Sequence, residues 1–349
     1  MTAWRTTLAK QGQMAAFKKA ATWGTAVEVG ASNGLPFKSI SGLQSTQDVF
    51  EVTEVDLPIR QCAFLGVNKP VDLTITSDMS FSPTALGTLI AKLFGSAGTP
   101  TGEGTAKTHK FKLTGDPGLF GTLAIGMPGE VWEIPSLKPY AWTLKVGGEG
   151  LIESEIKAIG NKLVAPATVN NETSMNAVTY DERCNHCFSK QMKLYINNQS
   201  GGDFQTSDII DINSFEISVN RAHQEVVSIT ADEISQPVDT APATVDLKIG
   251  FPKYGSSISS LIADQVAGTK KKAKLEITGP IITSEPAAYY KLTFYFPCLV
   301  IKPVTAKYED IISADMEFLG LAVSTAPTGM DEAVPYMTLI NKRTTDYLG

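Results

Sequence analysis

VDLTI (71–75) and VDLKI (245–249) are two copies of one strand-like pattern in a chain of 349 residues. Their first residues are 174 positions apart (245 − 71), which is about half of the chain. Each copy alternates apolar and polar residues, as expected for a strand with one buried face. The spacing indicates an internal duplication if the flanking segments also match in the same order.

The segments next to the two copies do match in order. Upstream, FEVTEV (50–55) resembles FEISVN (215–220), and both alternate with period two. Downstream, SPTALGTLIAKLFGS (82–96) and YGSSISSLIADQVAG (254–268) each predict one short helix, because their apolar residues recur at three- and four-residue spacing. Each copy of the VDL pattern is therefore expected to precede the same helix.

Two further pairs of segments follow the predicted helices. FKLTG (111–115) resembles KLEITG (274–279), and 139–160 resembles 307–320, with both members of the second pair ending on glycine. The ordered match predicts two copies of a mainly β domain, each a β-sandwich or barrel with one flanking helix and only minor α+β character. We expect an arm at 1–34, domains at 35–165 and 188–326, a linker at 166–187 and a tail at 327–349.

Composition and charge describe an ordinary globular chain, with 43% hydrophobic and 19% charged residues and a formal net charge of −6. An acidic balance argues against a protein that grips phosphate groups. The single basic run is expected in a solvated loop; it contains Lys270, Lys271, Lys272 and Lys274. Neither an export signal nor a membrane anchor is expected, because the most apolar stretch (289–301) is too short to span a bilayer.

The most enzyme-like string is CNHC (184–187), where Cys184, His186 and Cys187 could supply part of a zinc site. A structural zinc site needs four ligands, and the other candidates occur singly along the chain: Cys62, Cys298, His109 and His223. We expect reduced, inert thiols, no metal, no cofactor and no catalytic residues. The chain is therefore not expected to be an enzyme.

Acidic residues alternate with apolar ones in two of the matched segments. Glu153 and Glu155 lie in the first, and Asp315 and Glu317 lie in the second. Alternation places the members of each pair on one face of a strand, which is usually the solvated face of a sheet. If both copies faced one shared space, its wall would be acidic.

The succession of an arm containing ATWGTAVEV (21–29), a strand, a long loop, a VDL strand, one helix and closing strands resembles the tail tube proteins of tailed bacteriophages. Over nearly the whole chain it is similar to the version whose subunit carries two tube domains. The resemblance implies trimeric rings of six β-sandwich domains, whose inner sheets form a continuous barrel. It also implies that the rings stack into a tube through which DNA passes without specific binding.

The resemblance further implies partners and a location. The partners would be further copies of the chain, a tape-measure protein and tail terminator or tip proteins, and the location would be the virion tail after assembly in the host cytoplasm. Loops 56–70 and 221–244 are the first candidates for contacts between stacked rings, followed by 1–34 and 327–349.

A different class of function is also open, in which two β-sandwich modules bind a carbohydrate or a cell surface. That function predicts a cluster of exposed aromatic side chains on one face. The tryptophans are instead spread between the arm and the first half, at Trp4, Trp23, Trp132 and Trp142. An enzyme ranks third among the alternatives.

Overall fold

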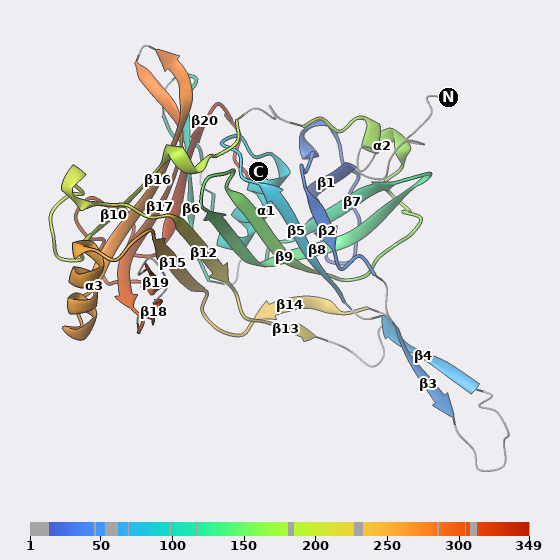
Figure 1. Cartoon of the computed structure of the whole chain (residues 1–349). Helices are drawn as coiled ribbons and strands as arrows, with labels where there is room; N and C mark the ends of the chain where they lie inside the picture. Colours follow the sequence, from blue (N-terminus) through green and yellow to red (C-terminus); the bar gives the residue numbers. More distant parts are fainter. Residues whose placement is uncertain are drawn as a thin grey trace.

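A computed structural model describes residues 14–44, 47–52, 62–68, 70–97, 99–102, 104–115, 118–180, 185–226, 233–284, 286–303, 305–307 and 313–348. The expected mainly β class is confirmed, because about half of these residues lie in antiparallel strands and few lie in helices (Figure 1). The first half contains β1 (Met14–Lys19), β2 (Ser39–Ser41), β3 (Gln47–Val52), β4 (Cys62–Asn68), β5 (Val71–Asp78), α1 (Ala85–Phe94), β6 (Lys107–Lys112), β7 (Gly121–Met127), β8 (Glu130–Gly147) and β9 (Glu153–Gly160).

The second half follows a short helix, α2 (Glu172–Asn176). It contains β10 (Met192–Asn198), β11 (Ile209–Ile210), β12 (Ser214–Asn220), β13 (His223–Val226), β14 (Ser235–Asp239), β15 (Thr244–Phe251), α3 (Ser256–Val266), β16 (Lys271–Ser284), β17 (Ala287–Ile301), β18 (Thr305–Lys307), β19 (Ser313–Leu321) and β20 (Tyr336–Asn341). The helices α1 and α3 occupy the two segments where the sequence predicts them.

One order of six strands occurs twice in the sheet. In the first half it is β1-β7-β8-β9-β5-β2, and in the second half it is β10-β16-β17-β19-β15-β12. We call these two sets of strands, with α1 and α3 respectively, the first repeat and the second repeat. Pairing of β12 with β8 joins them, so that the repeats form one 16-stranded sheet instead of two separate sheets.

The VDL strands have the same register in both repeats. Val71 of β5 lies opposite Gly160 of β9, and in the second repeat Val245 of β15 lies opposite Gly320 of β19. The aspartate of each copy accepts a hydrogen bond, from a residue of β8 in the first repeat and from the residue that directly follows β17 in the second. The Tyr140 hydroxyl donates to Asp72 at 3.0 Å, and Lys302 Nζ donates to Asp246 at 2.8 Å.

A β-bulge also recurs at one place in the two long strands. In β8 the extra residue falls between Ile134 and Leu137, and in β17 it falls between Phe296 and Leu299. The intervening residues are Pro-Ser in β8 and Pro-Cys in β17. Proline lacks the N–H that a strand ladder requires, so a bulge is one of the few interior positions that accept it.

Two of the segment matches expected from the sequence are wrong. Phe50 lies in β3, which pairs with β4 in a separate hairpin, whereas FEISVN forms β12, whose place in the first repeat is taken by β2. FKLTG overlaps β6, which pairs with β20, and the counterpart of β16 is β7. The reason is that period-two alternation is common to all half-buried strands and does not specify their partners.

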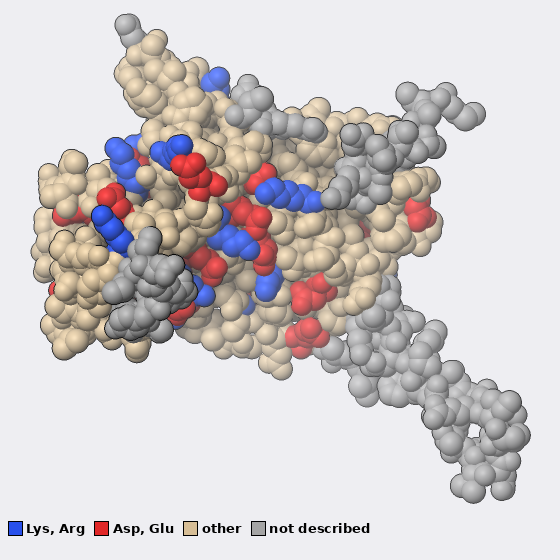
Figure 2. Space-filling view, viewed as in Figure 1, with Lys and Arg blue, Asp and Glu red and all other residues tan. Residues whose placement is uncertain are grey.

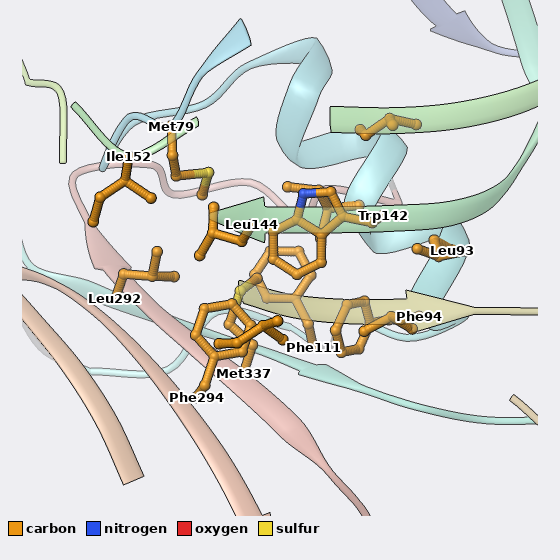
Figure 3. Close-up of a cluster of buried hydrophobic side chains, with 14 of the residues drawn as sticks. Met79, Leu93, Phe94, Phe111, Trp142, Leu144, Ile152, Leu292, Phe294 and Met337 are labelled. Carbon is orange, nitrogen blue, oxygen red and sulfur yellow. The ribbon is translucent and has the colours of Figure 1, made fainter. Parts of the chain in front are cut away.

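The hydrophobic core extends across both repeats. Trp142 of the first repeat lies between Phe94 and Phe294, with ring centroids 6.0 and 5.5 Å away (Figure 3). Buried apolar residues of β5, α1, β8, β15, β17 and β20 belong to the same cluster. Burial of this shared apolar surface therefore holds the halves together as one folded unit.

The segments expected as arm, linker and tail are packed against the repeats in their described parts. Strand β1 pairs with β7, the Glu133 carboxylate binds Thr168 and Asn170, and β20 pairs with both β17 and β6. Near the C-terminus, Tyr347 is buried against α1. Within the described ranges, no helix has the length and apolarity required to cross a membrane.

Candidate assembly surfaces

One face of the joined sheet is polar. Strands β5, β9, β8, β12, β15 and β19 bury alternate apolar residues in the core and carry mostly polar or charged residues on the opposite side. We call this opposite side the polar face. In Figure 2, Lys and Asp/Glu side chains of both signs are interspersed over the middle of the visible surface.

A row of alternating charges crosses the polar face from strand to strand. Successive register partners on β9, β8, β12, β15 and β19 are Glu153, Lys145, Glu216, Lys248 and Glu317. Lys145 Nζ lies 3.2 Å from Glu153, and Lys248 Nζ lies 3.4 Å from Glu216 and 3.7 Å from Glu317. We call these five residues the charge row; they line a hollow of about 610 Å³.

Further lysines pair with the carboxylates at both ends of the charge row. Lys38 lies 3.8 Å from Glu153 and 2.6 Å from Asp78, and Lys302 lies 3.7 Å from Glu317 and 2.8 Å from Asp246. Hydrogen bonding to Asp246 raises the pKa of Lys302, and the negative charge of Glu216 raises that of Lys248. Exposed pairs of this kind each stabilise a fold by at most about 1 kcal/mol. Their larger effect is that the carboxylates compensate the positive charges of the lysines on this surface.

The four acidic residues expected on sheet faces do share one face. Glu153, Asp315 and Glu317 line the hollow, and Glu155 lies 3.6 Å from Lys145. Their register partners show that Glu155 and Asp315 are equivalent, because Thr143 faces the first and Thr305 faces the second. The interleaved lysines have no local signal in the sequence, because their acidic neighbours come from strands distant in sequence.

Two edges of the polar face pair on one side only among the described strands. Strand β2 pairs with β5, and strand β18 pairs with β19. The junction inside the chain, between β8 and β12, extends from the pair Ser214–Gly147 to the pair Asn220–Ala141.

Two β-hairpins precede the VDL strands. The β3–β4 hairpin projects from the body, whereas β13–β14 lies along it (Figure 1). The loops expected to contact stacked rings fall here: residues 62–68 form β4 and residues 223–226 and 235–239 form β13 and β14. Residues 53–61 and 227–232 lie outside the described part of the chain.

A buried ionic cluster attaches β13–β14 to the first repeat. Asp239 accepts from Lys138 at 3.1 Å and from Arg221 at 2.9 Å, and all three side chains are almost fully buried. Arg221 also donates to the carbonyl oxygens of Leu93 at 2.6 Å and Phe94 at 3.2 Å. Because carbonyls at the end of a helix lack intrahelical partners, Arg221 serves as the C-terminal cap of α1.

The residues considered for metal or thiol chemistry are dispersed where described. Cys187 is fully buried between Met79 and Ile152, and burial raises the pKa of its thiol. Cys298 is also buried, and His109 Nε2 lies 3.0 Å from the Arg343 carbonyl. Cys184 lies outside the described residues, as does the side chain of Cys62. The ring of His223 is tilted by 40° to that of Tyr140, with centroids 4.3 Å apart. No cluster of three potential ligands occurs among the residues described.

The basic run is not a solvated loop, contrary to expectation. Residues from Lys271 onward form β16, and Lys272 is fully buried, with its Nζ donating to three carbonyls at 2.7–2.9 Å. Lys274 Nζ lies 4.2 Å from the ring centroid of Tyr195. The carbonyls belong to Gly201, Gly202 and Thr328, which are far from the run in sequence.

The described tryptophans do not form an exposed cluster. Trp142 is buried in the core, Trp23 donates to the Ile234 carbonyl, and Trp132 donates to Glu130. Trp4 lies outside the described residues. No protein-family model and no curated protein matches the sequence.

Proposed function

We propose that the chain is a structural subunit that joins edge to edge into rings, with the polar face lining a channel, as in a phage tail tube. The observation that carries this proposal is the junction of β8 with β12. It is a lateral contact between two copies of one strand order, so the chain already contains one step of such a ring. A contact that repeats in one direction generates a closed ring when its rotation closes.

The equivalence of the repeats specifies the next step of the ring. Strand β2 has the place of β12, because each pairs with the VDL strand of its repeat. Strand β18 has the place of the second half of β8, because each pairs with the Gly-ended strand. The same junction between molecules would therefore pair β18 of one copy with β2 of the next.

Closure of the ring would protect the edge strands β2 and β18. Unpaired strand edges are templates for aggregation, and a closed barrel removes them. With two repeats in each chain, three copies would supply the six domains that the resemblance to tail tube proteins implies. Stacked rings would form a conduit.

The charge row suits a surface along which DNA slides. Each lysine that contacts a DNA phosphate adds salt-dependent affinity. Lys145 and Lys248 instead have carboxylates as immediate neighbours, so a phosphate would compete with an existing ion pair. A wall of this kind would favour passage over binding.

Disulfide cross-linking tests the junction between molecules. Glu216 faces Lys145 in the internal junction, and the equivalent positions are Ser41 and Lys307. Directly opposed residues have Cα atoms about 4.5–5.5 Å apart, which permits a disulfide. Ser41→Cys/Lys307→Cys should yield a closed covalent trimer under oxidation, together with hollow rings by electron microscopy.

The matched control is Ser41→Cys/Thr305→Cys, which moves one cysteine by two residues on the same side of the strand. Its diagonal separation of about 7–8 Å should prevent efficient cross-linking. Equal cross-linking of both variants, or a chain that stays monomeric at all concentrations, would refute the proposal.

A further inference from the structure

The two hairpins have equivalent places in chain order, each directly before a VDL strand. In β3–β4, Val49 faces Leu65, and in β13–β14, His223 faces Asp239. Both members of the second pair are 174 residues beyond those of the first (223 − 49 and 239 − 65), as are the VDL strands. Leu65 therefore has the strand position of Asp239.

The surface under β13–β14 is polar and covered. Asp239 binds Lys138, the Pro237 carbonyl accepts from Lys138 at 2.8 Å, and Glu233 accepts from Asn161 at 2.7 Å. Lys138 is 1% exposed and Asn161 is fully buried. The hairpin therefore seals charged and amide groups of the first repeat.

The equivalent surface of the second repeat is apolar and open. Lys138 faces Ile159 and Val300 faces Leu319, which makes Val300 the counterpart of Lys138. Asn161 directly follows Gly160 as Leu321 follows Gly320, so Leu321 is the counterpart of Asn161. Val300 and Leu321 are each 37% exposed.

We propose that the β3–β4 hairpin of a second copy docks on the surface formed by Val300 and Leu321. This inference rests on the proposed ring, because β3 follows β2 as β13 follows β12. Pairing β2 with β18 would place the hairpin over Val300, as pairing β12 with β8 places β13–β14 over Lys138. The ion pair Lys138–Asp239 inside the chain would have the apolar contact Val300–Leu65 as its counterpart between chains.

The difference between the ionic contact within the chain and the apolar contact between chains would determine which surface the β3–β4 hairpin binds. A β3–β4 hairpin placed on the first repeat would bury Lys138 without the carboxylate that Asp239 supplies, because Leu65 has that strand position; this is strongly unfavourable. Placed on the second repeat, it buries apolar surface. The hairpin thereby directs successive chains to meet second repeat to first, which is the order that a ring requires.

A charge exchange tests the docking. Val300→Lys and Leu65→Asp should each raise the concentration needed for assembly by about 100-fold or more, because each buries an unpaired charge in the contact. The double variant Val300→Lys/Leu65→Asp recreates the pair of Lys138 and Asp239 and should recover most of the loss. Val169→Lys is the matched control, because Val169 is 38% exposed and lies outside this surface.

The readouts are sedimentation of assembled rings and, for each monomer, the midpoint of thermal unfolding. Unchanged assembly of Val300→Lys, or a double variant no better than the single ones, would overturn the docking while Ser41–Lys307 cross-linking still supported the ring. Absence of assembly in the unsubstituted chain would overturn both proposals.

Discussion

Replacing Arg221 by methionine should destabilise the protein strongly. Arg221 is 2% exposed, and its guanidinium donates to Asp239, to the last carbonyls of α1 and to the Thr114 carbonyl at 2.9 Å. Methionine has similar length but no donors, so Arg221→Met keeps much of the packing and removes the hydrogen bonds. The substitution leaves a buried carboxylate with one cationic partner fewer.

The expected loss in the free energy of unfolding depends on the interactions that Asp239 keeps in the variant. Removing one partner of a buried ion pair costs about 3–5 kcal/mol. Lys138 still lies 3.1 Å from Asp239, which retains part of the charge compensation, so the lower end of this range, about 3 kcal/mol, is expected. Because domains unfold with about 5–15 kcal/mol in total, the change is a large fraction of the stability.

Urea unfolding of the monomer, followed by circular dichroism, measures this loss. Lys302→Met is the control, because the Lys302–Asp246 pair is partly exposed and should contribute less than about 1 kcal/mol. Hydrogen exchange should also show β13–β14 opening first in Arg221→Met. A loss no larger than that of Lys302→Met would refute the role assigned to the buried cluster.

Three further predictions concern the core and its buried groups. Burial alone would raise the pKa of Glu133, but hydrogen bonds from Asn170 and Thr168 have the larger combined effect and lower it below 4.5. These hydrogen bonds therefore stabilise the fold above pH 4.5, and their contribution is lost as the pH falls through the lowered pKa. Glu133→Gln should therefore reduce stability at pH 7, with the difference shrinking in acid unfolding experiments. Cys187 and Cys298 should resist a thiol reagent at pH 8 until urea unfolds the chain, as measured by mass spectrometry of labelled peptides. Trp142→Ala should cost about 3–5 kcal/mol, and both repeats should lose hydrogen-exchange protection in one transition, because the core is shared.

The sequence identified the repeated elements better than their connections. The VDL strands, the helices after them and the strands ending on Gly160 and Gly320 are equivalent in three dimensions, as their spacing predicted. Each of these elements carries a local signal, either a residue pattern or a helical period. Pairings such as β8 with β12 and β20 with β6 depend on long-range packing, which local patterns do not encode.

A stronger signal for the correct alignment was present in the long strands. Ile-Pro-Ser-Leu (134–137) and Phe-Pro-Cys-Leu (296–299) share the order apolar, proline, small residue, leucine. They are the bulges of β8 and β17, and aligning them makes β8 the counterpart of β17 and fixes the register of each with its neighbour. The signal is easily overlooked, since proline is otherwise excluded from strand interiors.

The candidate surfaces differ between the repeats in the residues at equivalent positions. A duplicated chain begins with two identical junction surfaces, and here two successive residue pairs of the hairpins keep the same register while their residue types differ. Lys138 and Asp239 belong to one chain, so their two surfaces are covalently connected and always meet. An ionic cluster with a high desolvation cost is therefore tolerated there. Val300 and Leu65 would meet only when two separate copies of the chain associate, and burial of apolar surface is the interaction that drives association. Divergence at these equivalent positions, and not similarity, is therefore what distinguishes the contact within a chain from the contact proposed between chains.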